Sequence, residues 1–333
     1  MSRPLPPLTH PGLSHNGRAE LAAFRQSLDA LIPPKRESSR NLLIATWNIR
    51  AFASLTEKWT ALQSDSPKRD YRGMWFILEV ISRFDVIAIQ ELKGDLKALR
   101  TLMKTLGPNW SFLMTDVTEG AAGNSERLCF IFDATRLRLS GLACEIVVPE
   151  EWQEEISDSA LFRQFARTPY AVGFDANGSS FVLVTLHVDY GKNKEERQPE
   201  IEAIAEWMRR WATQSADWNQ NLIALGDFNI DRHGDDLWVA FTQKGLTVPA
   251  ELDAVPRTIF DDAKNRLEKY YDQIAWFADK DGIPLLSMLP VNAGGIRFAQ
   301  FAYQADGLTT SQVSYRVSDH LPLWVEFDLP NPA

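Results

Sequence analysis

Apolar runs of strand length alternate with amphipathic stretches from residue 41 almost to the end of the chain. The runs are apolar at nearly every position rather than at every second one, which indicates strands that are covered on both faces. They occupy residues 41–49, 85–92, 111–116, 127–133, 136–141, 170–188, 221–228, 270–279 and 318–329. Apolar residues at helical spacing predict helices over 69–84, 96–106 and 195–212. A hairpin turn is predicted at Ala176, Asn177 and Gly178, inside the run 170–188.

Strands buried on both faces need a second layer on each side. Their alternation with helices therefore predicts one α/β domain, in which two sheets pack together and helices shield the outer faces. Residues 1–40 are expected to lie outside this domain, as a Pro-rich arm followed by a short helix over 17–32 and a polar linker. The domain itself is expected to span residues 41–333.

Composition narrows the class of protein. The chain has 333 residues, 45% of them apolar, with 35 basic and 44 acidic side chains and a net charge of −9, which excludes an intrinsically disordered protein. An acidic chain is poorly suited to coating nucleic acid without sequence preference. It is compatible with an enzyme that cuts phosphodiesters at a metal ion, because a site for a divalent metal is itself acidic.

Two further features of the sequence bear on where in the cell the protein is expected. The two cysteines, Cys129 and Cys144, have no metal-type neighbours at short spacing, so a disulfide framework and a thiolate zinc site are not expected. Residues 1–16 contain no apolar core of a secretory signal, and no segment is long and apolar enough to cross a membrane. We therefore expect a cytoplasmic protein that does not enter the membrane.

Short polar interruptions stand at one end of several apolar runs. The preference of Asn and Asp for turns explains any one of them. Together, however, they are all carboxylates, amides or imidazoles, and strand ends on one edge of a sandwich meet in space. The set consists of Asn48, Gln90, Glu91, His187, Asp227, Asn229, Asp272, Asp319 and His320.

This set of side chains suits metal-assisted hydrolysis of phosphate esters. Mg²⁺, or Mn²⁺ as the alternative, prefers carboxylate and amide oxygens. A hydrolytic water needs a carboxylate or imidazole to take its proton, and a histidine beside an aspartate can act as general acid or base. The chain has no G-x-S-x-G motif and no Gly-rich phosphate loop that would favour a different mechanism.

Six short blocks follow one another in a fixed order: TWN (46–48), IQE (89–91), TLH (185–187), GDFN (226–229), YDQI (271–274) and SDH (318–320). In this order they resemble the endonuclease/exonuclease/phosphatase superfamily, whose members have the deoxyribonuclease I-like fold. The resemblance covers about residues 41–329. It implies a four-layer α/β/β/α sandwich of two packed mixed β-sheets.

The resemblance also implies which residues bind the metal and the water. Glu91 would be the principal metal ligand, and Asn48 would help to hold the metal or the phosphate. Asp319 would complete the network of metal and water. Asp227 and Asn229 would position the attacking water and a phosphate oxygen.

The two histidines receive separate roles from the resemblance. His320 would be the essential histidine, oriented by Asp272. His187 would bind the scissile phosphate and assist the leaving group, as in the deoxyribonuclease I branch. Abasic-site endonucleases of the superfamily have a tyrosine at the place of His187, which disfavours a dedicated base-excision role, although sphingomyelinases and inositol-phosphate phosphatases also have histidine there.

Two further matches are less specific. Glu126 lies where the deoxyribonuclease I branch has a carboxylate that supports the second histidine, and the alternative is a surface ion pair. Arg167 matches an R-x-P block whose arginine touches a backbone phosphate, and the alternative is a solvated charge at a strand end.

Three functions remain open at this point. The first is a metal-dependent endonuclease that acts on DNA or RNA, with a basic rim around the site. The second is a phosphatase or phospholipase-type hydrolase of a small or lipid phosphate, for which only residues 298–308 offer an apolar loop, unless they pack against the sandwich. The third is an inactive scaffold that docks partners through the N-terminal arm. We expect a monomer. The candidate rim residues are Arg50, Lys58, Lys68, Arg69, Arg72, Lys93, Arg167, Lys192, Lys194 and Arg297.

Overall fold

The structure, a computed structural model, describes residues 5, 8–35, 40–118, 124–147, 167–191, 194–213 and 221–330. Within these residues the chain forms two six-stranded sheets. The first sheet has the strand order β11-β12-β1-β2-β4-β3 and the second β5-β6-β7-β8-β10-β9. The first comprises β1 (Asn41–Phe52), β2 (Val86–Lys93), β3 (Trp110–Met114), β4 (Glu126–Asp133), β11 (Leu289–Gly295) and β12 (Leu323–Asp328). The second comprises β5 (Arg138–Glu145), β6 (Tyr170–Ala176), β7 (Ser179–His187), β8 (Leu222–Asp227), β9 (Leu246–Thr247) and β10 (Asp272–Phe277).

Both sheets are mixed. The pairs β1–β2 and β7–β8 are parallel, and the other strand pairs are antiparallel. Parallel neighbours need a crossover connection, which helices provide in both sheets. One of these helices connects β1 to β2, and the other connects β7 to β8. Because each pair is parallel, the carboxyl ends of β1 and β2 lie side by side, and so do the carboxyl ends of β7 and β8.

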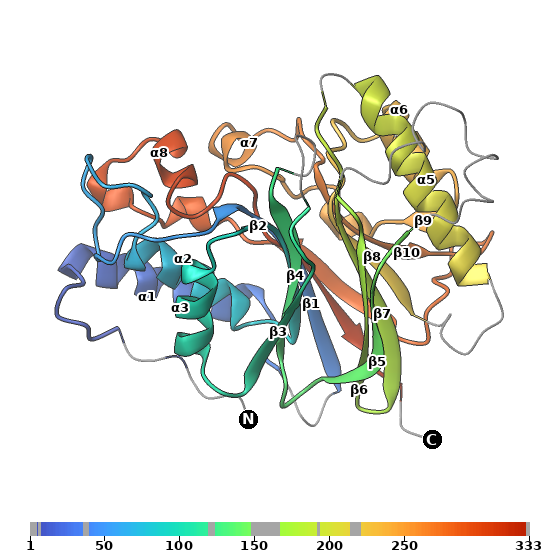
Figure 1. Ribbon diagram of the computed structural model, residues 1–333, viewed down its shortest axis with the longest axis horizontal. Coiled ribbons are helices and arrows are strands. Elements are labelled where there is room, and N and C mark those ends of the chain that lie inside the picture. The colour runs from blue at the N-terminus through green and yellow to red at the C-terminus, as the bar shows by residue number, and fades with distance from the viewer. Residues whose placement is uncertain are drawn as a thin grey trace.

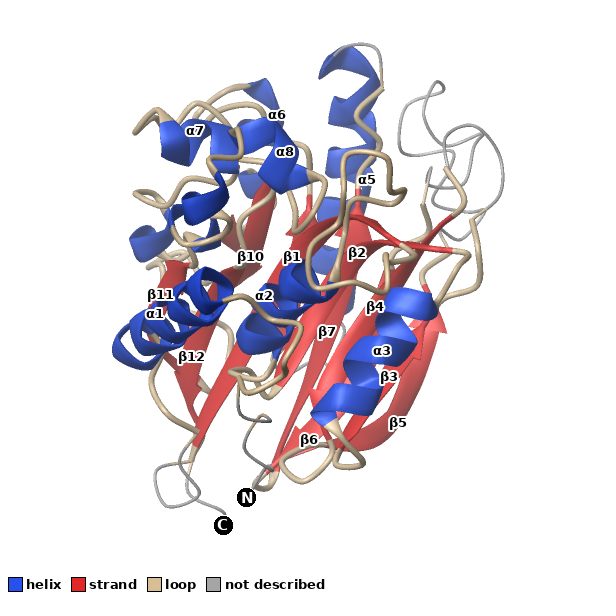
Figure 2. Ribbon diagram, turned by 90° about the vertical axis from the view of Figure 1, so that its left-hand side faces the viewer, coloured by secondary structure: helices blue, strands red, loops and turns tan. Residues whose placement is uncertain are grey.

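Helices cover the outer face of each sheet (Figures 1 and 2). One apolar cluster joins the first sheet to α1 (His15–Leu31), α2 (Tyr71–Ile81) and α3 (Lys97–Leu106). A second joins the other sheet to α5 (Lys194–Thr213) and α6 (Asp236–Thr242). A third lies between the two sheets and contains alternate residues of the strands, such as Leu42 and Ile44 of β1. The predicted four-layer α/β/β/α sandwich is confirmed.

Short helical segments occupy the connections at one end of the sandwich. In Figure 1, α7 and α8 lie at the upper end of the sandwich. These segments are α7 (Ile259–Ala263), α8 (Thr310–Ser314), η1 (Ala250–Leu252), η2 (Phe298–Gln300) and η3 (Gln304–Asp306).

The N-terminal helix belongs to the core. Ser14 caps α1 by accepting a hydrogen bond from the Gly17 N–H. The buried face of the helix, formed by Leu21, Phe24 and Leu28, lies in the same apolar cluster as β1 and α2. The boundary that the sequence suggests near residue 41 therefore does not mark where packing begins.

Two other segments differ from what the sequence suggests. The sequence does not predict strand β11, because its residues LPVNAGG include a proline and two glycines and lack a continuous apolar run. Residues 298–308 pack against the sandwich rather than forming an exposed apolar loop, since Phe298, Ala302 and Tyr303 are all buried. Within the part of the chain that the structure describes, no helix has both the length and the apolar character needed to span a bilayer.

Candidate active site

The polar ends of five core strands meet at one edge of the sandwich. In the first sheet, Asn48 of β1 is in register with Gln90 of β2. In the second, Asp227 of β8 is in register with both His187 of β7 and Asp272 of β10. We call this edge, with the segment 318–320 that precedes β12, the polar edge.

Buried hydrogen bonds join the two sheets at the polar edge. The Gln90 side chain donates from Nε2 to the Thr185 hydroxyl of β7 over 2.9 Å and also contacts Thr46 of β1 at 3.1 Å. All three side chains are fully buried. Buried polar groups with satisfied partners fix the relative position of the layers that carry them. Gln90 is therefore a structural residue, which holds the functional ends of both sheets in place.

Asp227 is the centre of the site. Its Oδ2 accepts a hydrogen bond from the Asn48 amide over 2.9 Å. The same oxygen lies 3.5 Å from Nε2 of His187 and 3.9 Å from Nε2 of His320. Its Oδ1 accepts from the backbone N–H of Asn229 over 2.9 Å. Residues from β1, β7, β8 and the segment before β12 thus converge on one carboxylate.

Each histidine is held from behind by its own carboxylate. His320 Nδ1 lies 2.7 Å from Oδ2 of Asp272, and His187 Nδ1 lies 2.9 Å from Oε2 of Glu126. In both pairs the Nδ1 atom faces the supporting carboxylate, so Nε2 is left facing Asp227. A carboxylate on Nδ1 fixes the tautomer and orientation of the ring. The arrangement therefore presents two oriented imidazole nitrogens to one point.

Asp227, Asp272 and His320 form a largely buried group of ionisable side chains. Each offers one atom that could bind a metal ion, and these atoms all lie within 4.8 Å of one another. Burial, together with the negative charge of Asp227, raises the pKa of Asp272 to about 6. Burial also opposes protonation of His320, but the charges of Asp272 and Asp227 outweigh it and raise the pKa of this imidazole well above its usual range. The group therefore retains a proton at neutral pH.

Glu126 is supported by three cations or donors. Its Oε1 accepts from Lys93 over 2.8 Å and from the Asn124 amide over 2.7 Å, and its Oε2 lies 2.8 Å from Nε of Arg167. Burial opposes ionisation of Glu126, but the hydrogen bond and charge of His187, with Arg167 and Lys93, lower its pKa to about 2. Glu126 is only 2% exposed, so the surface ion pair considered for it is excluded.

Arg167 is buried behind His187 rather than solvated at a strand end. It is 7% exposed, and its NH1 donates to the backbone carbonyl of His187. The same NH1 lies 3.8 Å from Asp189. The guanidinium thus secures the Glu126–His187 pair from the far side, while its direct contact with a substrate phosphate stays a prediction.

Glu91 and Asp319 border the polar edge. Glu91 has a left-handed backbone, with φ 62°, and its carboxylate accepts from the Ala51 N–H over 2.8 Å. Asp319 forms an ion pair with Arg50 over 3.2 Å. The charges of Glu91 and Asp319 both act on the same buried guanidinium, that of Arg69. A strained backbone at a non-glycine residue is typical of functional sites.

Ser318 ties the C-terminal segment of the site to β1. Its hydroxyl donates to the Asn48 carbonyl over 2.7 Å and accepts from the His320 N–H over 3.1 Å. Sequence reasoning treated Ser318 only as part of the block SDH. A small hydroxyl that both donates and accepts suits this position, because the backbones of both partners approach it closely.

The donor set fits a hard divalent cation. Oδ1 of Asn48 is buried and has no hydrogen-bond partner, although its Nδ2 is engaged with Asp227. An unpartnered buried carbonyl oxygen is costly unless a ligand completes it. Asp227, which contacts the same amide, offers carboxylate oxygens of the kind that Mg²⁺ and Mn²⁺ prefer. Among the described residues, the carboxylates and imidazoles whose ligand atoms lie close enough to share one cation are Asp227, Asp272 and His320, so the contribution of Glu91 and Asp319 stays a prediction.

The backbone conformation at the end of β8 explains two residues of the block GDFN, Gly226 and Asn229. Gly226 has φ 143°, and a Cβ there would lie 2.2 Å from the Leu186 carbonyl oxygen of β7. Only glycine allows this close approach. Asn229 has φ 51°, and its amide donates to the Val188 carbonyl over 2.7 Å. These contacts align the end of β8 with the end of β7, and so place Asp227 beside His187.

The predicted basic rim is smaller than expected. Arg50, Lys93 and Arg167 do lie at the polar edge, each paired with a carboxylate of the site. Arg69 and Arg72 are buried structural residues: Arg69 donates to the backbone carbonyls of Ala51 and Val317, and Arg72 forms ion pairs with Glu20 and Asp306.

The remaining rim candidates have other surroundings. Lys58 pairs with Asp65 of its own loop, and Arg297 pairs with Asp262. Lys68 donates to backbone carbonyls of the loop that contains Asp65. Lys192 and the side chain of Lys194 lie outside the described residues.

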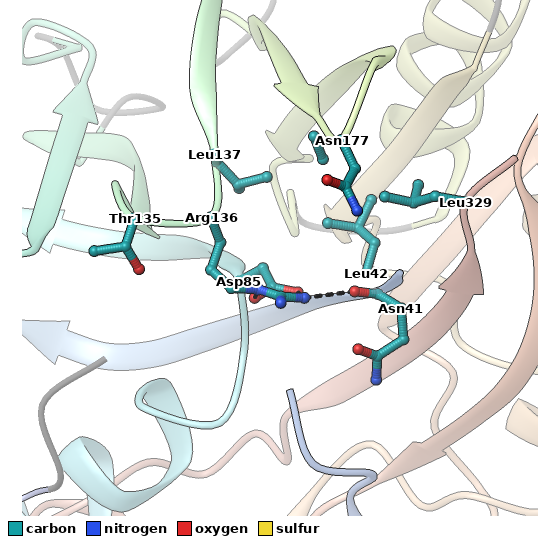
Figure 3. Close-up of a pocket in the computed structure, with 9 residues that line it drawn as sticks. Asn41, Leu42, Asp85, Thr135, Arg136, Leu137, Asn177 and Leu329 are labelled. Carbon is teal, nitrogen blue, oxygen red and sulfur yellow. Dashed lines mark hydrogen bonds and ion pairs between the residues drawn. The ribbon is translucent and has the colours of Figure 1, made fainter. Parts of the chain in front are cut away.

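A cavity of about 210 Å³ lies at the opposite end of the sandwich (Figure 3). It is lined by the first residues of β1, the residue that follows β12 and the β6–β7 turn, including Asn41, Asn177 and Leu329. Arg136 reaches the Asn41 carbonyl here and pairs with Asp85 over 2.7 Å. A second cavity, of about 230 Å³, lies between Trp59, Trp75 and α3. Neither cavity is lined by a residue of the polar edge.

Comparison with known proteins agrees with this geometry. Residues 45–320 match the Endonuclease/Exonuclease/phosphatase family. The chain is 25% identical over 314 residues to a deoxyribonuclease from Thioalkalivibrio sp. (strain K90mix), covering 92% of this chain and 76% of that protein.

Two solved structures illustrate the shared fold. A mannosyl-6-phosphatase from Bacteroides thetaiotaomicron has a TM-score of 0.55 at 18% identity, over 86% of this chain and 99% of that chain. Humanized D. rerio TDP2 has a TM-score of 0.57 at 15% identity, over 87% of this chain and 99% of that chain. At these identities the likeness concerns the fold alone.

Proposed function

Because the chain belongs to the endonuclease/exonuclease/phosphatase family, we propose that it is a divalent-metal-dependent phosphodiesterase, an endonuclease that hydrolyses DNA or RNA. The observation that carries this proposal is the convergence of two carboxylate-supported histidines on Asp227. The deoxyribonuclease that resembles this chain over most of its length supports nucleic acid as the substrate.

The residues divide into a cation site and a proton-transfer site. Asn48, Glu91 and Asp319 would hold the cation, Mg²⁺ or Mn²⁺, which when bound supplies positive charge to a phosphate oxygen. Asp227 and Asn229 position the attacking water. His320, held by Asp272, and His187, held by Glu126, lie on either side of Asp227 and can each exchange a proton through Nε2.

The reaction is in-line hydrolysis. The water oxygen forms a bond to phosphorus, and its proton passes to the group of Asp227, Asp272 and His320. The bond from phosphorus to the leaving oxygen breaks on the opposite side, where His187 stabilises the developing charge and assists proton transfer to that oxygen. Two oriented imidazoles are needed because attack and departure occur on opposite faces of the phosphorus.

One panel of substrates tests the proposal. Purified protein is incubated with supercoiled plasmid, single-stranded DNA, RNA and small phosphate monoesters, in MgCl₂ or in EDTA. Asp227→Ala serves as the inactive variant, and Asp175→Ala, in β6 at the opposite end of the sandwich, serves as its matched control. We expect metal-dependent nicking by the wild type and by the control but not by Asp227→Ala.

Two results would contradict the proposal. Release of phosphate from small esters with nucleic acid left intact would assign the protein to the phosphatases. Absence of hydrolysis with every substrate and metal would favour the scaffold interpretation, which the retention of Glu91, Asp227 and His320 currently opposes.

A further inference from the structure

A row of aromatic and cationic side chains continues the polar edge on both sides of His320. On one side, the Tyr271 ring lies 5.7 Å from the His320 ring, and the Tyr190 ring meets Tyr271 edge-on at 6.2 Å. On the other side, Arg50 pairs with Asp319 over 3.2 Å, and its guanidinium lies 4.0 Å from the ring centre of Tyr315. The row therefore runs through neighbouring contacts from one tyrosine to another.

The two outer tyrosines are exposed. Tyr190 is 50% exposed and Tyr315 is 52% exposed, whereas most other aromatic side chains among the described residues lie in the apolar clusters. Tyr190 follows His187 by three residues, so it lies within about 11 Å of it. Tyr190 precedes α5 and Tyr315 follows α8, and these two helices lie on opposite sides of the sandwich (Figure 1).

Each exposed ring rests on an arginine. Arg197 lies 4.6 Å from the ring centre of Tyr190, and it is itself buried and fixed by the Asn229 carbonyl and the Asp231 carboxylate. Arg50 holds Tyr315 in the same way while it pairs with Asp319. A ring that is covered by a fixed cation on one face can offer its other face to a flat partner.

We propose that Tyr190 and Tyr315 are stacking platforms for the bases on the two sides of the scissile phosphate, and that the substrate is a single-stranded or locally unstacked stretch of nucleic acid. This inference rests on the proposed nuclease function. Bases can stack on protein rings only where they are free of their own stack, as in single strands. The arginines beneath the rings, each fixed by a carboxylate, hold the two rings in place for such stacking.

Paired substrates separate this role from the chemistry. Cleavage in MgCl₂ is measured on a short single-stranded oligonucleotide and on the same strand with abasic tetrahydrofuran residues, which keep the phosphates and lack the bases. The quantity compared is the ratio of kcat/KM between the two strands. Tyr190→Leu and Tyr315→Leu should each lower this ratio about tenfold, whereas Tyr190→Phe and Tyr315→Phe should retain it. Ile283→Ala removes an exposed apolar side chain of a distant loop and serves as control.

The outcomes distinguish the two proposals. If the wild type cleaves both strands and the ratio is the same in every variant, the stacking proposal is wrong and the nuclease function stands. Equal loss on both strands would assign the tyrosines a structural role instead, which also contradicts stacking. If the wild type cleaves neither strand but nicks plasmid or cleaves the duplex, the stacking proposal is wrong and the nuclease function stands. If it cleaves no nucleic acid in any form, the nuclease function itself fails, and the stacking proposal fails with it. Cleavage of the same sequence as a duplex should be at least about tenfold slower than as a single strand.

Discussion

The two ends of the sandwich contain similar residues in different electrostatic states. At the end shown in Figure 3, the buried carboxylate of Asp85 is paired with Arg136 and accepts the Leu43 N–H over 2.8 Å. Nearby, Lys35 pairs with Asp133 over 3.2 Å, so two carboxylates meet two cations. At the polar edge, Asp227 is met by an amide, two imidazoles and a backbone N–H, and it repels Asp272.

This difference in charge compensation indicates which end of the sandwich is the active one. A buried carboxylate that is fully compensated holds strands together and has no reason to exchange a proton. A buried carboxylate that faces another carboxylate, as Asp227 faces Asp272, retains electrostatic repulsion, which a cation or a proton relieves. A cavity alone is therefore a poor guide here, because the cavity of Figure 3 lies at the compensated end.

The same substitution at the two ends gives the sharpest test of this comparison. Asp227→Asn should lower kcat/KM on the nucleic acid substrate by about 10³- to 10⁴-fold, because it removes the group that positions and deprotonates water. Its free energy of unfolding should change by less than about 1 kcal/mol, since the lost attraction to His320 offsets the relieved repulsion with Asp272. Asp85→Asn should leave kcat/KM nearly unchanged and should lower the free energy of unfolding. Steady-state kinetics and urea unfolding are measured on both variants. If the two variants lose the same activity and the same stability, the two ends of the sandwich do not differ as proposed.

The second prediction concerns the compensated end alone. Arg136→Met leaves the Asp85 carboxylate buried with weaker compensation, because Lys35 lies 3.9 Å away from it. We expect the free energy of unfolding to fall by about 4 kcal/mol, measured by urea denaturation. The double variant Asp85→Asn with Arg136→Met should recover part of this loss. Full stability of the single variant would mean that the charges at this end are not coupled.

The position of the polar edge could be predicted from the sequence because strand ends on one edge must meet. Asn48, His187, Asp227 and Asp272 each follow or begin an apolar run, and the structure brings all four together. Their roles follow from residue type and from the order of the blocks. No local pattern, however, distinguishes such a strand end from an ordinary turn, so the order of six blocks was needed.

The environment of the arginines could not be predicted. Arg72 is buried because Glu20 of α1 and Asp306 lie beside it, and both partners are remote in sequence. For Arg167 the sequence allows either contact with the substrate or solvation at a strand end, whereas the structure buries it against Glu126. Whether a charged side chain is exposed depends on long-range packing, and a basic residue in a loop carries no local sign of it.

The third prediction concerns how the free energy of unfolding depends on pH through Glu126, a carboxylate of the polar edge. The pKa of Glu126 is about 2 in the folded protein and about 4.3 in an unfolded chain. A lowered pKa stabilises the fold above pH 4.3, and this contribution, about 3 kcal/mol, is lost as pH falls toward 2. Glu126→Gln should therefore be less stable than the wild type at pH 7, and the difference should shrink at pH 3. Urea unfolding at both values measures it, and a difference independent of pH would refute the assignment.

The smallest predicted effect concerns the cation. Glu91 is half-buried, and its carboxylate contacts only the Ala51 N–H among the hydrogen bonds described for it, so Glu91→Gln should change the free energy of unfolding by less than about 0.5 kcal/mol. If Glu91 is a metal ligand, removal of its charge should weaken Mg²⁺ binding about tenfold, which corresponds to about 1.4 kcal/mol. Calorimetric titration with MgCl₂ measures this loss, beside Asp175→Asn as a control at the compensated end. Equal affinity in all three proteins would move the cation site to the Asp227 group and away from Glu91, because that group already gathers two carboxylates and an imidazole.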